Sequence, residues 1–176
     1  MVNSDNEIMF FNSVITIKKP LLNDEIKFIQ FFYEHTQVLP LNILINNDYI
    51  FIFVNNNDYF NAKRNFRKLR YKIKLPSKKY LIIRAESTLI RLIFTFFQDT
   101  YIHNILFEKK LECKVKKIRI LFLFKEDRLI AVGNSGNYIK TINFIFNNYL
   151  FVKNHQKLER INPVELVCEL KSLSIE

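Results

Sequence analysis

The apolar positions of the first half of the chain fall in short runs that polar and turn-forming residues separate. Five such runs occupy residues 8–17, 25–34, 38–40, 49–54 and 80–84. Turn-forming segments, Asn46-Asn47-Asp48 and Pro76-Ser77, lie between the later runs. Short apolar runs with turn residues between them are typical of the strands of a small β-barrel. Residues 1–85 are therefore predicted to form a barrel of the OB type.

The second half of the chain shows helical spacing instead. Apolar residues recur at intervals of three and four over residues 89–97 and again over residues 138–149. The intervening segments predict a short turn over 101–107, one or two strands over 111–124 and a short helix over 128–132. A strand over 151–152 and a closing helix over 165–173, begun by Asn162 and Pro163, complete the predicted series.

Only two glycines occur in the chain, and they stand three residues apart at Gly133 and Gly136. Glycine adopts positive φ angles and permits the close approach of another backbone, because it lacks a Cβ atom. A Gly-x-x-Gly turn just ahead of a helix is the element by which KH modules clamp a nucleic-acid backbone. Together with the order of elements around it, this turn predicts a bacterial-type (type II) KH domain over residues 86–176. The predicted fold class is thus α+β, an OB barrel followed by a KH domain.

The composition is that of a folded chain with a polyanionic partner. Of the 176 residues, 49% are hydrophobic, enough to form a core, and the formal net charge is +10. A strong positive charge indicates binding to a polyanion, most often a nucleic acid. An AT-rich genome would also raise the lysine content, so this background explanation stands beside the functional one.

Positive charge concentrates before the last strand of the predicted barrel. Residues 63–84 contain ten lysine or arginine residues and no aspartate or glutamate. Four aromatic residues lie among or beside these cations: Tyr59, Phe60, Phe66 and Tyr71. Cations bind phosphates and aromatic rings stack on nucleobases, so a polyanion contact is favoured over a merely solvated face. If the first part of the segment is helical, Lys63, Arg67 and Arg70 share a face.

The predicted nucleic-acid contacts form two groups. The first surrounds the glycine turn and comprises Arg128, Gly133, Asn134, Ser135, Gly136, Asn137 and Lys140. The second lies in the basic segment and comprises Lys63, Arg64, Arg67, Lys68, Arg70 and Lys72. Since Asn134 and Ser135 carry no charge, most of the electrostatic affinity is expected from the second group.

Catalysis, metal binding and membrane insertion find no support in the sequence. His35, His103 and His155 are far apart, and Cys113 and Cys168 show no zinc spacing. No phosphate-binding glycine loop, nucleophile elbow or metalloprotease motif occurs. No apolar run reaches the roughly 18 residues that a membrane span requires. We expect a non-enzymatic protein without a cofactor, a metal or a membrane partner.

Four segments of the chain together carry a family resemblance: residues 38–40, residues 82–87 with the helix over 89–97, residues 131–139 and residues 158–165. In sequence and in order they resemble segments of the NusA family of bacterial transcription elongation and termination factors. Residues 131–139, Ala-Val-Gly-Asn-Ser-Gly-Asn-Tyr-Ile, resemble the family's Val-Gly-x-x-Gly-x-x-Val/Ile signature. The family often places a basic residue in the middle of this turn, where the chain has Asn134 and Ser135.

The resemblance implies a non-catalytic RNA-binding factor that acts in transcription elongation, termination and antitermination through an OB–KH surface. The implied partners are single-stranded RNA and RNA polymerase. The implied location is the bacterial cytoplasm, with an organelle matrix or stroma as the alternative. The element order also fits a KH-containing protein of the small ribosomal subunit, whose partner would be ribosomal RNA. A barrel in the first 85 residues would favour the transcription factor.

Overall fold

The computed structural model describes residues 4–46, 48–72, 77–109, 115–154, 157–161 and 163–171, which adopt a mixed α+β fold. The side chains of residues 4–7, 70–72, 109 and 154 lie outside this description. The described strands form three sheets of three strands each. The chain divides into two compact units, which we name the inserted unit (residues 19–86) and the split unit (residues 1–18 and 87–176).

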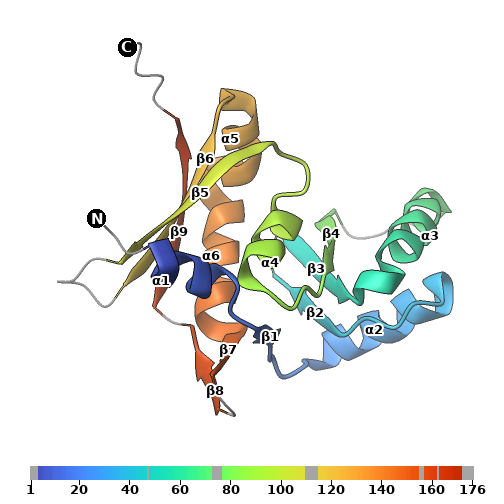
Figure 1. Cartoon of the computed structure of the whole chain (residues 1–176). Coiled ribbons are helices and arrows are strands. Elements are labelled where there is room, and N and C mark those ends of the chain that lie inside the picture. The colour runs from blue at the N-terminus through green and yellow to red at the C-terminus, as the bar shows by residue number, and fades with distance from the viewer. Residues whose placement is uncertain are drawn as a thin grey trace. The chain divides into compact units, whose positions relative to one another are not determined.

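The inserted unit combines one sheet with two long helices (Figure 1). Its elements are α2 (Asn23–Thr36), β2 (Asn42–Ile45), β3 (Tyr49–Val54), η1 (Asn56–Asp58), α3 (Tyr59–Lys72) and β4 (Lys79–Arg84). β2 and β3 form an antiparallel hairpin, and β4 pairs parallel to β3, so that β3 is central. All six side chains of β3 are buried, which explains its uninterrupted apolar sequence.

One stripe of α3 is apolar and belongs to the core of the inserted unit. Tyr59, Ala62, Phe66 and Leu69 repeat every three or four residues, and all four are buried. They join Phe32 of α2 and residues of β3 in one hydrophobic cluster. The described basic side chains of α3 fall outside this stripe, so burial of the apolar stripe leaves them exposed.

A buried carboxylate ties the beginning of α2 to the sheet. Glu25 is 1% exposed, and its carboxylate accepts hydrogen bonds from the N–H groups of Leu22 at 2.9 Å and Ile45 at 3.1 Å. The ammonium of Lys19, whose side chain is also largely buried, pairs with the same carboxylate. These contacts satisfy a backbone donor at the helix start and neutralise a charge that is unfavourable to bury alone.

The split unit contains the other described helices and strands. They are α1 (Ser4–Phe11), β1 (Ile15–Ile17), α4 (Leu89–Phe96), β5 (Ile102–Lys109), β6 (Lys116–Phe122), α5 (Lys125–Val132), η2 (Asn134–Gly136), α6 (Asn137–Tyr149), β7 (Leu150–Asn154), β8 (Lys157–Arg160) and β9 (Val164–Leu170). β5 and β6 pair antiparallel, and β9 pairs parallel to β6. Leu92, Phe96, Ile120, Phe122 and Phe146, from α4, β6 and α6, are all buried in the core.

Residues 1–18 complete the split unit through backbone pairing. β1 pairs antiparallel with β7, which pairs with β8 in a second small sheet. The N–H of Ile15 also donates to the carbonyl of Ser87 at 2.9 Å, and a β-bridge joins Val14 to Thr88. The chain segments before and after the inserted unit are thus neighbours within the split unit.

The two units share one topology. In each, a helix precedes an antiparallel hairpin, and a third strand pairs parallel to the second strand of that hairpin after an intervening helical segment. The corresponding elements are α2-β2-β3-α3-β4 and α4-β5-β6-α5-α6-β9. After the second strand, the split unit has α5 and the glycine turn, whereas the inserted unit passes through η1 directly into α3.

The barrel prediction for residues 1–85 is wrong in its secondary structure. The strands at 49–54 and 80–84 are confirmed as β3 and β4, but residues 25–34 lie in the helix α2. Glu25 binds the backbone at the start of this helix, and Phe28, Ile29 and Phe32 pack at helical spacing into the core. As a result, no closed barrel forms among the described residues of this half.

The second half was predicted better, with two errors. The helices over 89–97 and 138–149 and the strand at 151–152 are confirmed as α4, α6 and β7. Residues 102–107 lie in β5 rather than a turn, and residues 165–170 lie in β9 rather than a closing helix. Val164, Leu166 and Cys168 are buried while the residues between them are less so, a period-two pattern that is typical of a strand.

We expect Glu25→Gln to destabilise the inserted unit by about 3 to 5 kcal/mol, because the buried Lys19 ammonium loses its counter-charge. Urea unfolding, with peptide-level hydrogen exchange to locate the effect in residues 19–86, measures this. Glu34→Gln removes a charge from the exposed side of the same helix and should change stability by less than about 0.5 kcal/mol. Equal unfolding midpoints for the two variants would contradict the structural role of Glu25.

Candidate nucleic-acid interface

The turn between α5 and α6 has a backbone conformation that side chains disfavour. Gly133 has φ 74° and ψ 176°, and Gly136 has φ 75° and ψ 11°. Ser135 between them is also left-handed, with φ 51°. A Cβ atom crowds the backbone at such angles, so glycine is strongly favoured. Both glycines of the chain therefore stand where the absence of a Cβ matters.

Positive charge lies beside this exposed turn. The side chains of Asn134, Ser135 and Asn137 are exposed. Lys140 stands one turn into α6, and its ammonium donates to the carbonyl of Ser135 at 3.3 Å. Because α6 begins at Asn137, the positive end of its helix dipole lies at the same place. A cation and a helix N-terminus next to an exposed turn favour the approach of a phosphate group.

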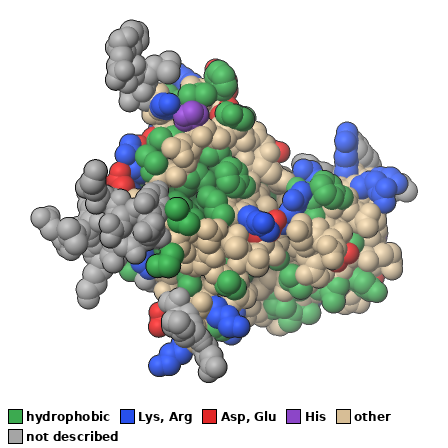
Figure 2. Space-filling model, in the orientation of Figure 1, with side chains coloured by type: hydrophobic (Ala, Val, Ile, Leu, Met, Phe, Trp, Pro, Cys, Tyr) green, Lys and Arg blue, Asp and Glu red, His purple; other side chains and the backbone are tan. Residues whose placement is uncertain are grey.

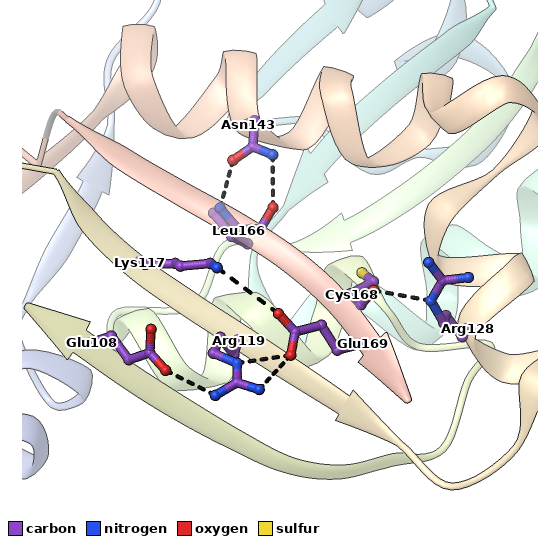
Figure 3. Close-up of polar contacts among 8 residues, drawn as sticks. All are labelled: Glu108, Lys117, Arg119, Arg128, Asn143, Leu166, Cys168 and Glu169. Carbon is purple, nitrogen blue, oxygen red and sulfur yellow. Dashed lines mark hydrogen bonds and ion pairs between the residues drawn. The ribbon is translucent and has the colours of Figure 1, made fainter. Parts of the chain in front are cut away.

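Two asparagines hold α6 on the free edge of β9. The Asn143 amide donates to the carbonyl of Leu166 at 2.9 Å and accepts from its N–H at 2.7 Å (Figure 3). Asn147 makes the same pair of bonds with Val164, at 2.7 Å and 3.0 Å. Each amide takes the place that the backbone of a further strand would occupy. The edge of β9 is thereby satisfied without another strand.

Arg128 extends this row of contacts from α5. Its Nε atom donates to the carbonyl of Cys168 at 3.1 Å, two residues beyond Leu166 (Figure 3). The bond gives Arg128 a structural role, because it holds α5, and with it the start of the glycine turn, against the sheet. The predicted contact of Arg128 with RNA stays a prediction beside this role.

The sheet β5-β6-β9 also carries an ion-pair network across its strands. Arg119 of β6 bonds Glu108 of β5 at 2.8 Å and Glu169 of β9 at 2.5 Å and 2.8 Å (Figure 3). Lys117 lies 3.9 Å from the Glu169 carboxylate. Hydrogen bonds to Glu169 and Glu108 raise the pKa of the Arg119 guanidinium above its usual value. Two cations and two carboxylates balance here, so this face lacks the excess positive charge that phosphate binding requires.

The basic segment of residues 63–72 is a helical face in α3. Lys63, Arg64, Arg67 and Lys68 are all exposed, so these four cations face solvent. Figure 2 shows lysine and arginine side chains gathered over α3, at the right of the view. The side chains of Arg70 and Lys72, also predicted contacts, lie outside the described ones.

A cluster of rings and cations lies where α3 begins and β4 ends. The Cζ atom of Arg84 is 4.4 Å from the ring centroid of Tyr59 and 5.0 Å from that of Phe60. The two ring centroids are 5.3 Å apart in an edge arrangement. The Lys63 ammonium lies 3.3 Å from the Tyr59 hydroxyl. Tyr59 is buried but Phe60 is 69% exposed, so one aromatic face is open to solvent beside the cations.

The residues from Gly133 to Lys140 of the first predicted group lie together at the turn of the split unit, whereas Arg128 bonds to β9. The described side chains of the second group lie along α3 of the inserted unit. Three residues that shape these regions were not among the predicted contacts: Asn143, Asn147 and Arg84. The asparagines carried a signal, since asparagine is a poor helix former and two of them stand four residues apart in an apolar helix. Arg84 was counted among the ten cations of residues 63–84, but its position beside the start of α3 depends on the pairing of β4 with β3 and had no local signal.

Among the described residues, no group of three histidine, cysteine or acidic residues could hold a metal ion, and none of the helices could span a membrane. Burial raises the pKa of the Cys168 thiol to about 12, which makes it a poor nucleophile.

Comparison with known proteins establishes a fold precedent. No family model and no curated protein matches the chain. Among solved structures, the crystal structure of APE1850 is similar, with a TM-score of 0.55 and 18% sequence identity. The match covers 86% of this chain and 100% of that chain. At this identity the likeness shows a shared fold and nothing of function.

Asn143→Ala should lower the free energy of unfolding by about 2 to 4 kcal/mol, since the N–H and C=O of the buried Leu166 both lose their partner. Chemical denaturation measures the change. Asn148→Ala is the matched control, because the Asn148 amide bonds to Phe144 of its own helix. If both variants unfold at the same denaturant concentration, the amide contacts with β9 do not hold the helix.

Cys168 should resist alkylation in the folded protein. A pKa of about 12 leaves a thiolate fraction on the order of 10⁻⁴ at pH 8, and burial blocks access as well. Iodoacetamide treatment followed by peptide mass spectrometry should show labelling of Cys168 only after denaturation. Rapid labelling of the native protein would show that β9 opens readily.

Proposed function

We propose that this chain is a non-enzymatic protein that binds single-stranded RNA through a KH-type region in residues 87–171. The observation that carries the proposal is the exposed turn from Gly133 to Gly136, which has positive φ at both glycines and Lys140 beside it. Such a turn lets a sugar–phosphate backbone approach closely, as in the Gly-x-x-Gly loop of KH modules.

The order of elements around the turn supports the KH proposal. α4, the hairpin β5–β6, α5, the turn, α6 and the parallel strand β9 follow the order of a bacterial-type KH domain. The hairpin β7–β8 stands between α6 and β9 as an addition to this order. The row of contacts from Asn143, Asn147 and Arg128 to β9 makes the turn part of a rigid element, which suits a fixed ligand-binding loop.

The distribution of charge supports RNA over an uncharged ligand. The chain carries a net charge of +10, and α3 exposes four described cations on one helix. Cations that contact phosphates release counterions, which makes the affinity fall as salt rises. No acidic residue lies in α3 to oppose this attraction.

For the biological role, we propose transcription elongation, termination and antitermination, with RNA polymerase as a protein partner in the bacterial cytoplasm. The NusA-like segments, above all residues 131–139, support this role. A protein of the small ribosomal subunit is the second candidate, because the described residues of 1–85 lack the closed barrel that would have favoured the transcription factor. Copurification with tagged protein separates the two, since polymerase subunits indicate the first and salt-resistant ribosomal subunits the second.

RNA binding should be salt-dependent and should require the turn. In filter binding with a single-stranded RNA oligonucleotide, the logarithm of the affinity should fall linearly with the logarithm of salt concentration. Gly136→Asp should abolish binding through the turn, because its carboxylate repels phosphate and its Cβ blocks close approach. The positive φ of Gly136 strains any other residue there. The fold should nevertheless persist, since aspartate tolerates left-handed angles better than most residues and a Cβ at this position meets Lys140 only at 3.6 Å.

Asn148→Asp is the control for this variant. It places the same charge on the last turn of α6, far along the helix from the glycines, and should leave RNA affinity nearly unchanged. Circular dichroism checks that both variants are folded. A flat salt dependence of the native protein would overturn the proposed function, and full binding by folded Gly136→Asp would exclude the turn as the contact.

A further inference from the structure

We propose that the beginning of α3 is a second RNA contact, at which a nucleobase stacks on Phe60 and the adjoining phosphates bind the basic face of the helix. This inference rests on the proposed RNA-binding function. It assigns the inserted unit a contact of its own, with a different chemistry from that of the glycine turn.

The exposure of Phe60 is the first observation. At 69% it is the most exposed of the exposed aromatic residues that the structure describes. The neighbouring Tyr59 and the later Phe66 belong to the core, so the aromatic content of this helix does not act as one group. Single exposed apolar residues are common, so the exposure of Phe60 supports a binding site only together with the groups around it.

Arg84 supplies the second observation. Its guanidinium lies against the rings of both Tyr59 and Phe60, within the range of cation–π contact. Held in this way from the end of β4, it limits the motion of the Phe60 side chain and adds positive charge beside the ring. An aromatic ring with a guanidinium at its side is the arrangement that sequence-tolerant binders of single strands use to stack bases.

The exposed cations of α3 follow Phe60 along one stripe of the helix. Lys63 and Arg64 stand three and four residues after Phe60, and Arg67 and Lys68 stand seven and eight after it. At a rise of about 1.5 Å per residue, these pairs lie roughly 5 Å and 11 Å along the axis from the ring. A strand whose base stacks on Phe60 would thus meet cations in two successive steps along its backbone.

The two candidate contacts lie at equivalent positions in the shared topology of the two units. In both units the long helix that follows the second strand of the hairpin precedes the parallel third strand. In the split unit the glycine turn stands at the start of that helix, α6. In the inserted unit Tyr59 and Phe60 stand at the start of the corresponding helix, α3. The same junction therefore presents the candidate contact in each unit.

Stacking and charge together favour RNA over an acidic protein segment. Carboxylates would satisfy the cations of α3, but they offer no planar face to the exposed ring of Phe60. A nucleotide supplies both a planar base and a phosphate, and base–aromatic stacking adds about 1 to 3 kcal/mol per base.

The chain contains no tryptophan, so Phe60→Trp introduces a single fluorescent reporter at the site. Titration with a single-stranded oligoadenylate should quench its emission and should give an affinity close to that of the native chain. Phe94→Trp is the matched control, because Phe94 is also an exposed phenylalanine but lies on α4 of the split unit, and its emission should not respond.

Affinity measurements complete the test. Phe60→Ala should weaken oligoadenylate binding about 5- to 150-fold with an unchanged salt slope, because it removes stacking and no charge. The double variant Arg67→Ala/Lys68→Ala should instead reduce the slope by about 1.4. Since these side chains are exposed, circular dichroism should show all variants folded.

The outcomes distinguish this inference from the proposed function. If the native chain fails to bind oligoadenylate at low salt, both are overturned. If the native chain binds while Phe60→Ala binds equally well and Phe60→Trp is not quenched, only the second contact is overturned. Quenching of Phe60→Trp by polyglutamate and not by oligoadenylate would also overturn it, in favour of an acidic protein partner.

Discussion

The position of α6 depends on a match between two repeats. Four residues of a helix advance about 6 Å, and two residues of a strand advance about 6.6 Å. Asn143 and Asn147, four apart on α6, can therefore bond to Leu166 and Val164, two apart on β9, without distortion of either element. Because both amides must bond at once, the helix cannot slide along the strand. The glycine turn lies directly ahead of α6, so its position on the sheet is fixed as well.

Positive charge is used in two different ways in this protein. On the sheet β5-β6-β9, Arg119 and Lys117 are paired with Glu108 and Glu169, so the charges join strands and nearly cancel. On α3, exposed cations share a helix with no acidic residue, so the helix itself supplies no carboxylate to balance them. The net charge of the chain does not distinguish paired cations from exposed ones. The positions of the acidic residues make that distinction.

Elements with an unambiguous period were predictable from the sequence, and so was the turn. α4 and α6 showed the helical period, β3 was a continuous apolar run, and Gly133 and Gly136 were unique in composition. Residues 25–34 were predicted as a strand but lie in the helix α2. A dense apolar run fits a strand as well as the buried face of a helix, and only the packing of the folded chain distinguishes the two. β9 was missed because the Asn162-Pro163 signal was given more weight than the alternation after it. The contacts of Arg84 and of the asparagines join segments distant in sequence, and no local pattern predicts such pairs.

The order in which the chain leaves a ribosome has a consequence for the split unit. β1 pairs with β7, so Ile15 must wait for Val152, 137 residues later, before the ladder between these two strands can form. At roughly 5 to 20 residues per second, that interval lasts about 7 to 27 seconds. The inserted unit, by contrast, is contiguous and complete by residue 86, so it is free to fold during the wait. β1 is therefore the early segment whose strand pairing forms last. Until β7 is made, the β1 edge exposes unpaired backbone groups, which are a suitable binding site for a chaperone.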